Sequence, residues 1–132
     1  MVRNGKKARR LIVGDQTFLW SVRHEHDVDL AGELASRYRD CREVLSLRVY
    51  GLPGRLLITF NAGDGRIVSD GMLPGGTVGT TGSGWLNLNE PGTVRALLDE
   101  ALVQGWTPTT SAIQHLDGWQ FFEAVATRRQ AR

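Results

Sequence analysis

With 132 residues, 41% of them hydrophobic, the chain is long enough for one domain with its own apolar core, so it needs neither disulfides nor a structural metal to fold. Its single cysteine, Cys41, cannot form an internal disulfide, and its longest apolar runs fall far short of the about 20 residues that cross a bilayer, so we expect a cytoplasmic, membrane-free protein without a secretory signal. The formal net charge of +2 hides an uneven distribution of charge along the chain.

The two ends of the chain are basic, whereas the middle is acidic. Residues 1–8 and 128–132 form basic tails, and all 14 carboxylates lie between residues 11 and 127 together with only eight arginines. Such tails can attract a phosphate backbone in a salt-sensitive way, but an acidic body repels the same polymer. Nucleic-acid binding through the tails is therefore an alternative to a solubilising role.

Two strand-like runs, 9–14 and 17–25, open the chain, and the turn Gly14-Asp15-Gln16 between them predicts a β-hairpin. Alternation along the second run places one set of side chains on the core face: Phe18, Trp20, Val22, His24 and His26. The two histidines would finish this face at the rim of the core.

A helix is predicted next over Asp27–Asp40, followed by the clearest hairpin of the sequence, from strands 42–50 and 55–61. The inward side chains of this hairpin are Leu45, Leu47, Val49, Leu56, Ile58 and Phe60. A short strand over 66–69 then follows. These elements predict an antiparallel sheet of four or five strands built mainly by residues 9–70.

Half of the 16 glycines lie between Gly63 and Gly84, and we expect residues 71–84 to form a glycine-rich loop. Within it, residues 79–84 could present N–H groups and hydroxyls to a phosphate. The segment lacks both the GK[ST] of a nucleotide-binding loop and the strand-to-helix setting of a dinucleotide fingerprint. A flexible connection that a partner could order is the favoured interpretation.

Two helices are predicted in the last third of the chain. Pro91 suits a first turn, Gly105 suits a left-handed end, and an apolar stripe lies between them: Val94, Leu97, Leu98, Ala101 and Leu102. The first helix is thus expected over 91–104, a strand or linker over 111–116, and a terminal helix over 119–129. The fold class is α+β: an antiparallel sheet with two C-terminal helices packed on one face, in a single domain of residues 9–127.

His24 and His26 are the most suggestive pair for chemistry. Alternate residues of a strand point the same way, so these imidazoles could share a divalent metal with Glu25, Asp27 or His115. No HExxH motif, CxxC motif or compact carboxylate cluster supplies the remaining ligands. The sequence therefore assigns no metal site and no cofactor.

Cys41 could pair with a histidine as nucleophile and base, with Arg37, Arg39 and Arg42 close in sequence to activate it. Nothing else beside Cys41 marks an activated thiol, and no GxSxG motif occurs. The sequence assigns no catalytic residue and does not favour an enzyme.

The reverse face of the predicted sheet suits protein recognition, because arginine and tyrosine are enriched at binding hot spots. Arg23, Arg48 and Tyr50 share this face, and Trp85 stands where the glycine-rich segment meets the last elements. These four residues are the candidate partner-binding site. An ordinary solvated face, and a core position for Trp85, are the alternatives.

Three segments, WSVRH (20–24), LSLRVYG…GRLLITF (45–60) and LNLNEPGTVRALLDEALVQGWTP (86–108), resemble those of a group of small uncharacterised bacterial proteins of actinobacterial type. This resemblance implies a free-standing cytoplasmic domain with strands first and a Pro-started helix that ends in Gly-Trp. It implies no catalytic or binding residue.

The lack of a catalytic set, a cofactor signature and a targeting segment favours a non-enzymatic module, such as an adaptor or an immunity-like protein, that binds another protein. One alternative is an enzyme that binds a metal or phosphate ligand through His24, His26 and the glycine-rich loop. The other is a nucleic-acid accessory protein that acts through its basic tails.

Overall fold

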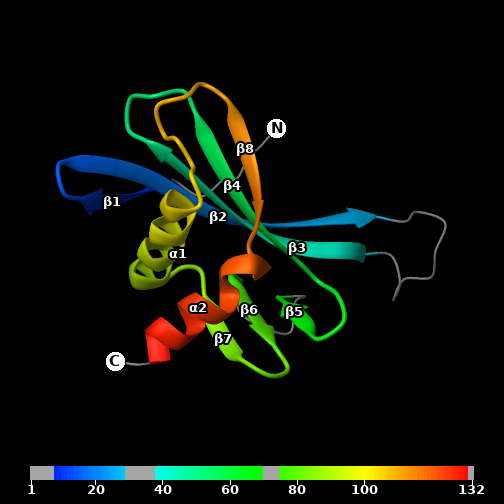
Figure 1. Cartoon of the computed structure of the whole chain (residues 1–132). Coiled ribbons are helices and arrows are strands. Elements are labelled where there is room, and N and C mark those ends of the chain that lie inside the picture. Colours follow the sequence, from blue (N-terminus) through cyan, green and yellow to red (C-terminus); the bar gives the residue numbers. More distant parts are fainter. Residues whose placement is uncertain (1–7, 29–37, 70–74, 131–132) are drawn as a thin grey trace.

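The computed structural model describes residues 8–28, 38–69 and 75–130 (Figure 1). The strands of this part are β1 (Arg9–Val13), β2 (Gln16–Val28), β3 (Tyr38–Val49), β4 (Arg55–Asn61), β5 (Arg66–Val68), β6 (Thr77–Thr80), β7 (Gly84–Asn87) and β8 (Ile113–Asp117), and its helices are α1 (Pro91–Val103) and α2 (Trp119–Gln130). The predicted α+β class is confirmed. Neither described helix is long and apolar enough to cross a membrane.

The strands form two sheets. The larger has the order β1-β2-β3-β4-β8 and is antiparallel except that β8 runs parallel to β4. The smaller, β5-β6-β7, is antiparallel throughout. Beyond the expected antiparallel sheet, the structure thus adds a parallel edge strand from residues 113–117 and a second sheet that contains β5.

Both predicted hairpins, β1–β2 and β3–β4, are confirmed by their antiparallel pairing. The six inward side chains expected for the second hairpin are all buried, because alternation places them on the covered face of the larger sheet. Phe18, Trp20 and Val22 of β2 continue the same buried face.

Helix α1 begins at Pro91 as expected and ends in a Schellman motif. Gly105 has a φ of 102°, its N–H donates to the Leu102 carbonyl at 3.1 Å, and the Trp106 N–H donates to the Ala101 carbonyl at 3.0 Å. The predicted stripe is buried except for Leu102, which is 38% exposed because it lies at the last turn, beyond the sheet-facing side chains.

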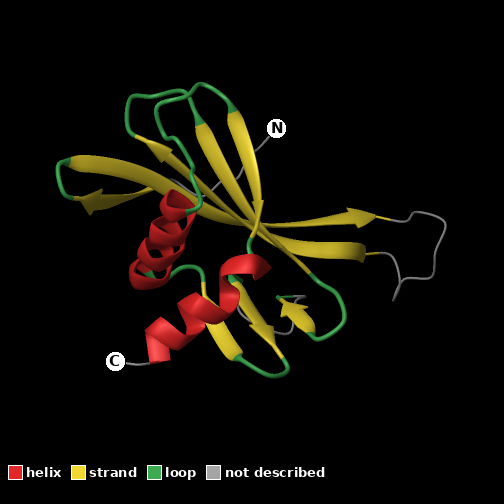
Figure 2. Ribbon diagram, in the orientation of Figure 1, coloured by secondary structure: helices red, strands yellow, loops and turns green. Residues whose placement is uncertain are grey.

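Both helices and the smaller sheet lie on the same side of the larger sheet (Figure 2). Phe121, Phe122 and Val125 of α2 join the core there. None of the described helices or strands covers the opposite face of the larger sheet. We call this uncovered side the open face.

The predicted helix over Asp27–Asp40 is wrong at both ends. Asp27 and Val28 belong to β2, and residues 38–40 belong to β3, because cross-strand pairing outweighs the short helical spacing. The middle of that segment, residues 29–37, lies outside the described residues.

The glycine-rich segment is also more regular than the expected loop over 71–84. From residue 77 onward it forms the β6–β7 hairpin, whereas residues 70–74 lie outside the described residues. Gly79 explains part of the glycine content: a Cβ at this position would come within 2.3 Å of the Trp85 ring. Close packing, not flexibility, requires glycine there.

Candidate metal centre

The far ends of β2 and β3 form a two-stranded ribbon that extends past the rest of the larger sheet (Figure 1). β1 pairs with β2 only as far as Trp20, and β4 pairs with β3 only as far as Arg42. On this ribbon, the face that is apolar at Trp20 and Val22 becomes polar.

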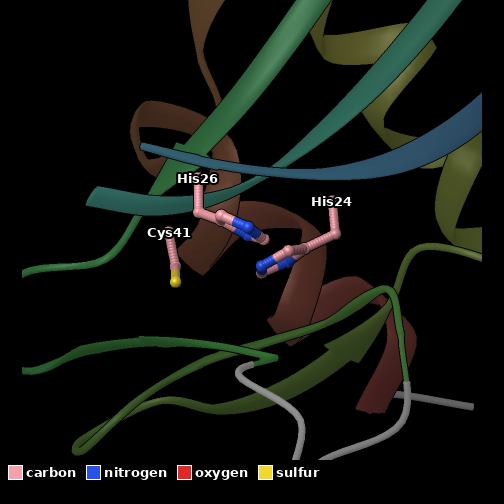
Figure 3. Close-up of side chains that lie close together, drawn as sticks. All are labelled: His24, His26 and Cys41. Atoms are coloured by element: carbon pink, nitrogen blue, oxygen red, sulfur yellow. The ribbon is translucent and has the colours of Figure 1, made fainter. Parts of the chain in front are cut away.

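His24, His26 and Cys41 come together on this face (Figure 3). Their ligand atoms all lie within 4.8 Å of one another. The two imidazole rings, at alternate positions of β2, have centroids 5.3 Å apart and planes inclined by 54°. Both histidines are exposed and Cys41 is half-buried, so an ion can reach the three side chains from solvent.

A β-bulge lies beside Cys41, at the point where it faces His26. The register shifts between Glu25 and Asp27, so that two residues of β3, Asp40 and Cys41, oppose the single residue His26. Asp40 accommodates the extra residue in the left-handed region, with a φ of 53°, which aspartate tolerates better than most side chains. Bulges often re-aim side chains next to functional sites.

Glu43 lies behind His24 and is only 1% exposed. It accepts hydrogen bonds from His24 Nδ1, from the Ser69 hydroxyl and, at 3.0 Å, from the backbone N–H of Gly76. Ser69 directly follows β5 and Gly76 directly precedes β6, so the smaller sheet holds this carboxylate in place. A carboxylate oxygen accepts, so Nδ1 of His24 donates to Glu43, and a metal ion would bind His24 through the lone pair of Nε2.

Two imidazoles and a thiolate form a donor set typical of Zn²⁺, and a set that copper also uses. With Zn–N near 2.05 Å and Zn–S near 2.3 Å, tetrahedral coordination needs ligand atoms about 3.3–3.6 Å apart. Side-chain rotations that close the gaps by about 1 Å are enough to reach that geometry from the observed cluster.

The structure places His24 and His26 together, but none of the three expected additional ligands joins them. Glu25 points to the open face, and Asp27 is largely exposed and pairs with Arg42 at 3.7 Å. His115 lies on β8, two strands away from the ribbon on the far side of β4.

Sequence reasoning considered Cys41 with a histidine only as nucleophile and base, and it missed both Cys41 as a third donor beside His24 and His26 and the supporting residue Glu43. A signal existed: Cys41-x-Glu43 has the same alternate spacing as His24-x-His26, so the two pairs meet if their strands are antiparallel neighbours. The expected helix over 27–40 hid this pairing. Arg42, expected to lie near Cys41, instead pairs with Glu25, and Arg37 lies outside the described residues.

Glu25 occupies the open face of the same ribbon. The hydrogen bond from the Arg23 guanidinium is the main cause that lowers the pKa of this carboxyl, and Arg42 adds to it, while partial burial opposes both. The open face of the ribbon is therefore ion-paired, whereas its other face carries the donor cluster.

Trp85 lies apart from the other three candidate partner-binding residues. Arg23 and Arg48 line one hollow on the open face. Tyr50 lies in the turn after β3 and is 65% exposed. Trp85 lies on β7 in the smaller sheet, packed over Gly79 and half exposed.

The turn of the β6–β7 hairpin borders another hollow, of about 310 Å³, at the start of α2. Asp64 and Glu123 line it, and the Ser83 N–H is already bonded to the Thr80 hydroxyl at 2.9 Å. The two carboxylates outnumber the one arginine of this lining, Arg66, and together with the occupied N–H they do not favour the phosphate site considered for residues 79–84.

No protein-family model, no curated protein and no solved structure matches this chain. The resemblance to an actinobacterial group therefore stays a prediction.

Proposed function

We propose that this chain binds a transition-metal ion, with Zn²⁺ as the best fit, through His24, His26 and Cys41. One observation carries the proposal: three donors of the right chemistry lie within 4.8 Å of one another on one face of a paired ribbon. Imidazole and thiolate are the ligands that zinc prefers, and no large backbone movement is needed to bring them together.

The support behind His24 distinguishes this cluster from histidines at the rim of a core. A rim histidine needs no buried partner, because water can satisfy it. Burial of a carboxylate is costly unless the group is fully hydrogen-bonded, and Glu43 is held by three donors while it orients His24. A carboxylate that fixes the tautomer of a metal-ligating histidine is the usual outer support of a zinc site.

Three protein ligands leave one coordination position for water or a small ligand. A zinc ion bound in this way lowers the pKa of its water to about 7 and can polarise a carbonyl or phosphoryl oxygen. The chemistry we propose is accordingly metal-assisted hydrolysis or the capture of a ligand at an open coordination position. A reducing cytoplasmic setting, which the single cysteine favours, would keep Cys41 reduced.

The test is metal binding by chelator-treated protein. Titration with Co²⁺, a spectroscopic substitute for zinc, should give the near-ultraviolet band of a cobalt–thiolate bond with a one-to-one endpoint. Competition against a coloured chelator then gives the zinc affinity. Cys41→Ser should abolish the thiolate band, and His26→Ala should weaken zinc binding by at least about tenfold.

His115→Ala is the matched control, because His115 is an exposed histidine outside the cluster. It should bind cobalt and zinc like the parent protein. A thiolate band that persists in the His26→Ala variant at unchanged affinity would contradict the proposal, as would equal losses in His115→Ala. If protein purified from cells contains mainly copper, the proposed site stands, but copper and not zinc is its ion.

A second candidate function is the binding of another protein through the open face. It is favoured by the exposure of Tyr50, an amphipathic side chain that is 65% exposed and lies two residues after Arg48 in the sequence. A photo-crosslinker at position 50 should capture one protein that a crosslinker at position 103, on the exposed Val103, does not. Identical capture patterns at both positions would refute this second function.

A further inference from the structure

Arginines gather across the open face of the larger sheet. The pairing register places Arg10 opposite Leu19, and Leu19 opposite Arg48. β3 and β4 pair with Leu47 opposite Leu56, so the next position of each strand sets Arg48 beside Arg55. Neighbouring strands are only about 4.8 Å apart, so these two guanidiniums start from adjacent backbone positions.

A small polar hollow lies where these strands meet. It has a volume of about 160 Å³, and its lining includes Ser21, Arg23, Ser46, Arg48 and Arg55. Small-molecule sites commonly occupy about 300–1,000 Å³, so this hollow suits a single charged group better than a whole organic ligand. The two serines, opposite each other on β2 and β3, add hydroxyl donors beside the arginines.

The charges of this hollow are not balanced by the described residues. Arg23 is paired with Glu25, which leaves its charge largely neutralised. Among residues 8–28, 38–69 and 75–130, no carboxylate forms an ion pair with Arg48 or Arg55. Like charges directly opposite on neighbouring strands destabilise a sheet, and a bound anion would reverse that contribution.

We propose that this hollow binds a tetrahedral oxyanion of the phosphate type, with Arg48 and Arg55 as its main ligands. Each guanidinium offers paired N–H donors that match two phosphate oxygens, and the hydroxyls of Ser21 and Ser46 can donate to the others. The site is separate from the metal centre, because it lies on the opposite face of the sheet. It extends the function proposed above without depending on it.

The experiment titrates inorganic phosphate into chelator-treated protein at constant ionic strength, followed by NMR of backbone amides or by calorimetry. Removal of metal prevents phosphate from binding as a ligand of an ion held by His24, His26 and Cys41. The parent protein should bind phosphate with a dissociation constant in the millimolar range or below. Arg48→Gln and Arg55→Gln should each weaken binding by at least about tenfold, the loss expected for one charge-assisted contact.

Arg95→Gln is the matched control. Arg95 is an exposed arginine on α1, on the other side of the molecule, and its loss changes the net charge by the same amount. It should leave phosphate binding within a factor of two. An equal loss in this control would mean that phosphate responds to net charge alone, and the proposal would then fail.

Thermal unfolding gives an independent measurement that does not assume binding. In phosphate-free buffer Arg55→Gln should melt at the same temperature as the parent or higher, because it removes a like-charge contact. Phosphate should raise the melting temperature of the parent but not of this variant. Equal phosphate-dependent shifts in both proteins would overturn the proposal.

The source of the anion is distinguished by a parallel titration with O-phosphoserine. Tighter binding of this ester assigns the hollow to a phosphate group on a larger ligand, and equal or weaker binding assigns it to the free ion; both results support the site. Normal phosphate binding by Cys41→Ser is expected. Loss of phosphate binding in Cys41→Ser with retention in Arg48→Gln would place the anion at the metal centre and refute the hollow.

Discussion

Replacement of Glu43 by glutamine should weaken zinc binding by about 10–100-fold while the side-chain volume is almost unchanged. One carboxylate oxygen of Glu43 accepts from both His24 Nδ1 and the Ser69 hydroxyl, and the other accepts from the Gly76 N–H. Glutamine has only one oxygen, so it can serve one of these two positions and must present an amide NH₂ at the other.

Both orientations of the new amide harm the site. With its oxygen at Gly76, the NH₂ group faces Nδ1 of His24, which must then become an acceptor and move its proton to Nε2, the nitrogen that would bind the metal. With its oxygen at His24, the NH₂ group opposes the Gly76 N–H, and two buried donors face each other at a cost of about 1–3 kcal/mol. A loss of about 1.4–2.7 kcal/mol corresponds to the 10–100-fold range.

The assay is zinc competition against a chelator of known affinity, with circular dichroism to verify the fold. Ser69→Ala is the matched variant, because it removes a neighbouring hydrogen bond to the same oxygen but leaves the charge and the His24 contact in place. It should lose less affinity than Glu43→Gln. Zinc affinity of a folded Glu43→Gln variant within a factor of two of the parent would refute the role of Glu43 in orienting His24.

Two further predictions concern stability, each measured by urea unfolding. Leu97→Ala on α1 should lower the free energy of unfolding by about 2–5 kcal/mol because Leu97 is completely buried. Leu102→Ala, at a position that is 38% exposed, should lower it by well under half as much. Equal losses would contradict the packing described for α1. Glu25 has a lowered pKa in the folded protein, so its ion pairs with Arg23 and Arg42 stabilise the fold above the ordinary value of 4.5 and are lost as the pH falls through the folded value. Glu25→Gln should therefore lower the free energy of unfolding by about 0.2–1 kcal/mol at pH 7 and by progressively less as the pH falls below 4.5, and a pH-independent difference would show that these pairs do not stabilise the fold.

The elements that the sequence predicted well are those specified by local patterns. The two hairpins follow from alternation and turn residues, and α1 follows from Pro91, an apolar stripe and Gly105 within one short segment. Helix α2 was equally readable, with Phe121 and Val125 turned inward as expected. In each case the residues that determine the element lie inside it.

The parts that sequence reasoning missed or left open depend on partners far along the chain. β8 exists because β4 offers a free parallel edge, with Ile58 beside Leu116, and nothing in the local pattern specifies that choice. The second sheet could not be read from residues 77–87, because glycine-rich composition resembles a loop unless the Trp85 ring over Gly79 is known.

The candidate metal centre was half predictable. Alternation alone places His24 and His26 on one face at the rim of the core, as expected. Cys41 joins them only through the register of β2 with β3, and a one-residue change in that register would direct the thiol to the opposite face. The sequence thus identifies the types of ligand, but not that strand pairing brings them close together.

All three donors of the cluster come from one hairpin, and this limits what an ion there could control. An ion shared by His24, His26 and Cys41 would cross-link residues that are close along the chain. Cross-links that close short loops contribute less to global stability than cross-links between distant segments. Removal of the ion should therefore loosen the pairing of β2 with β3 around His26 and Cys41 and leave the helix-covered centre folded. The local order at this end of the molecule would then depend on whether the metal is available.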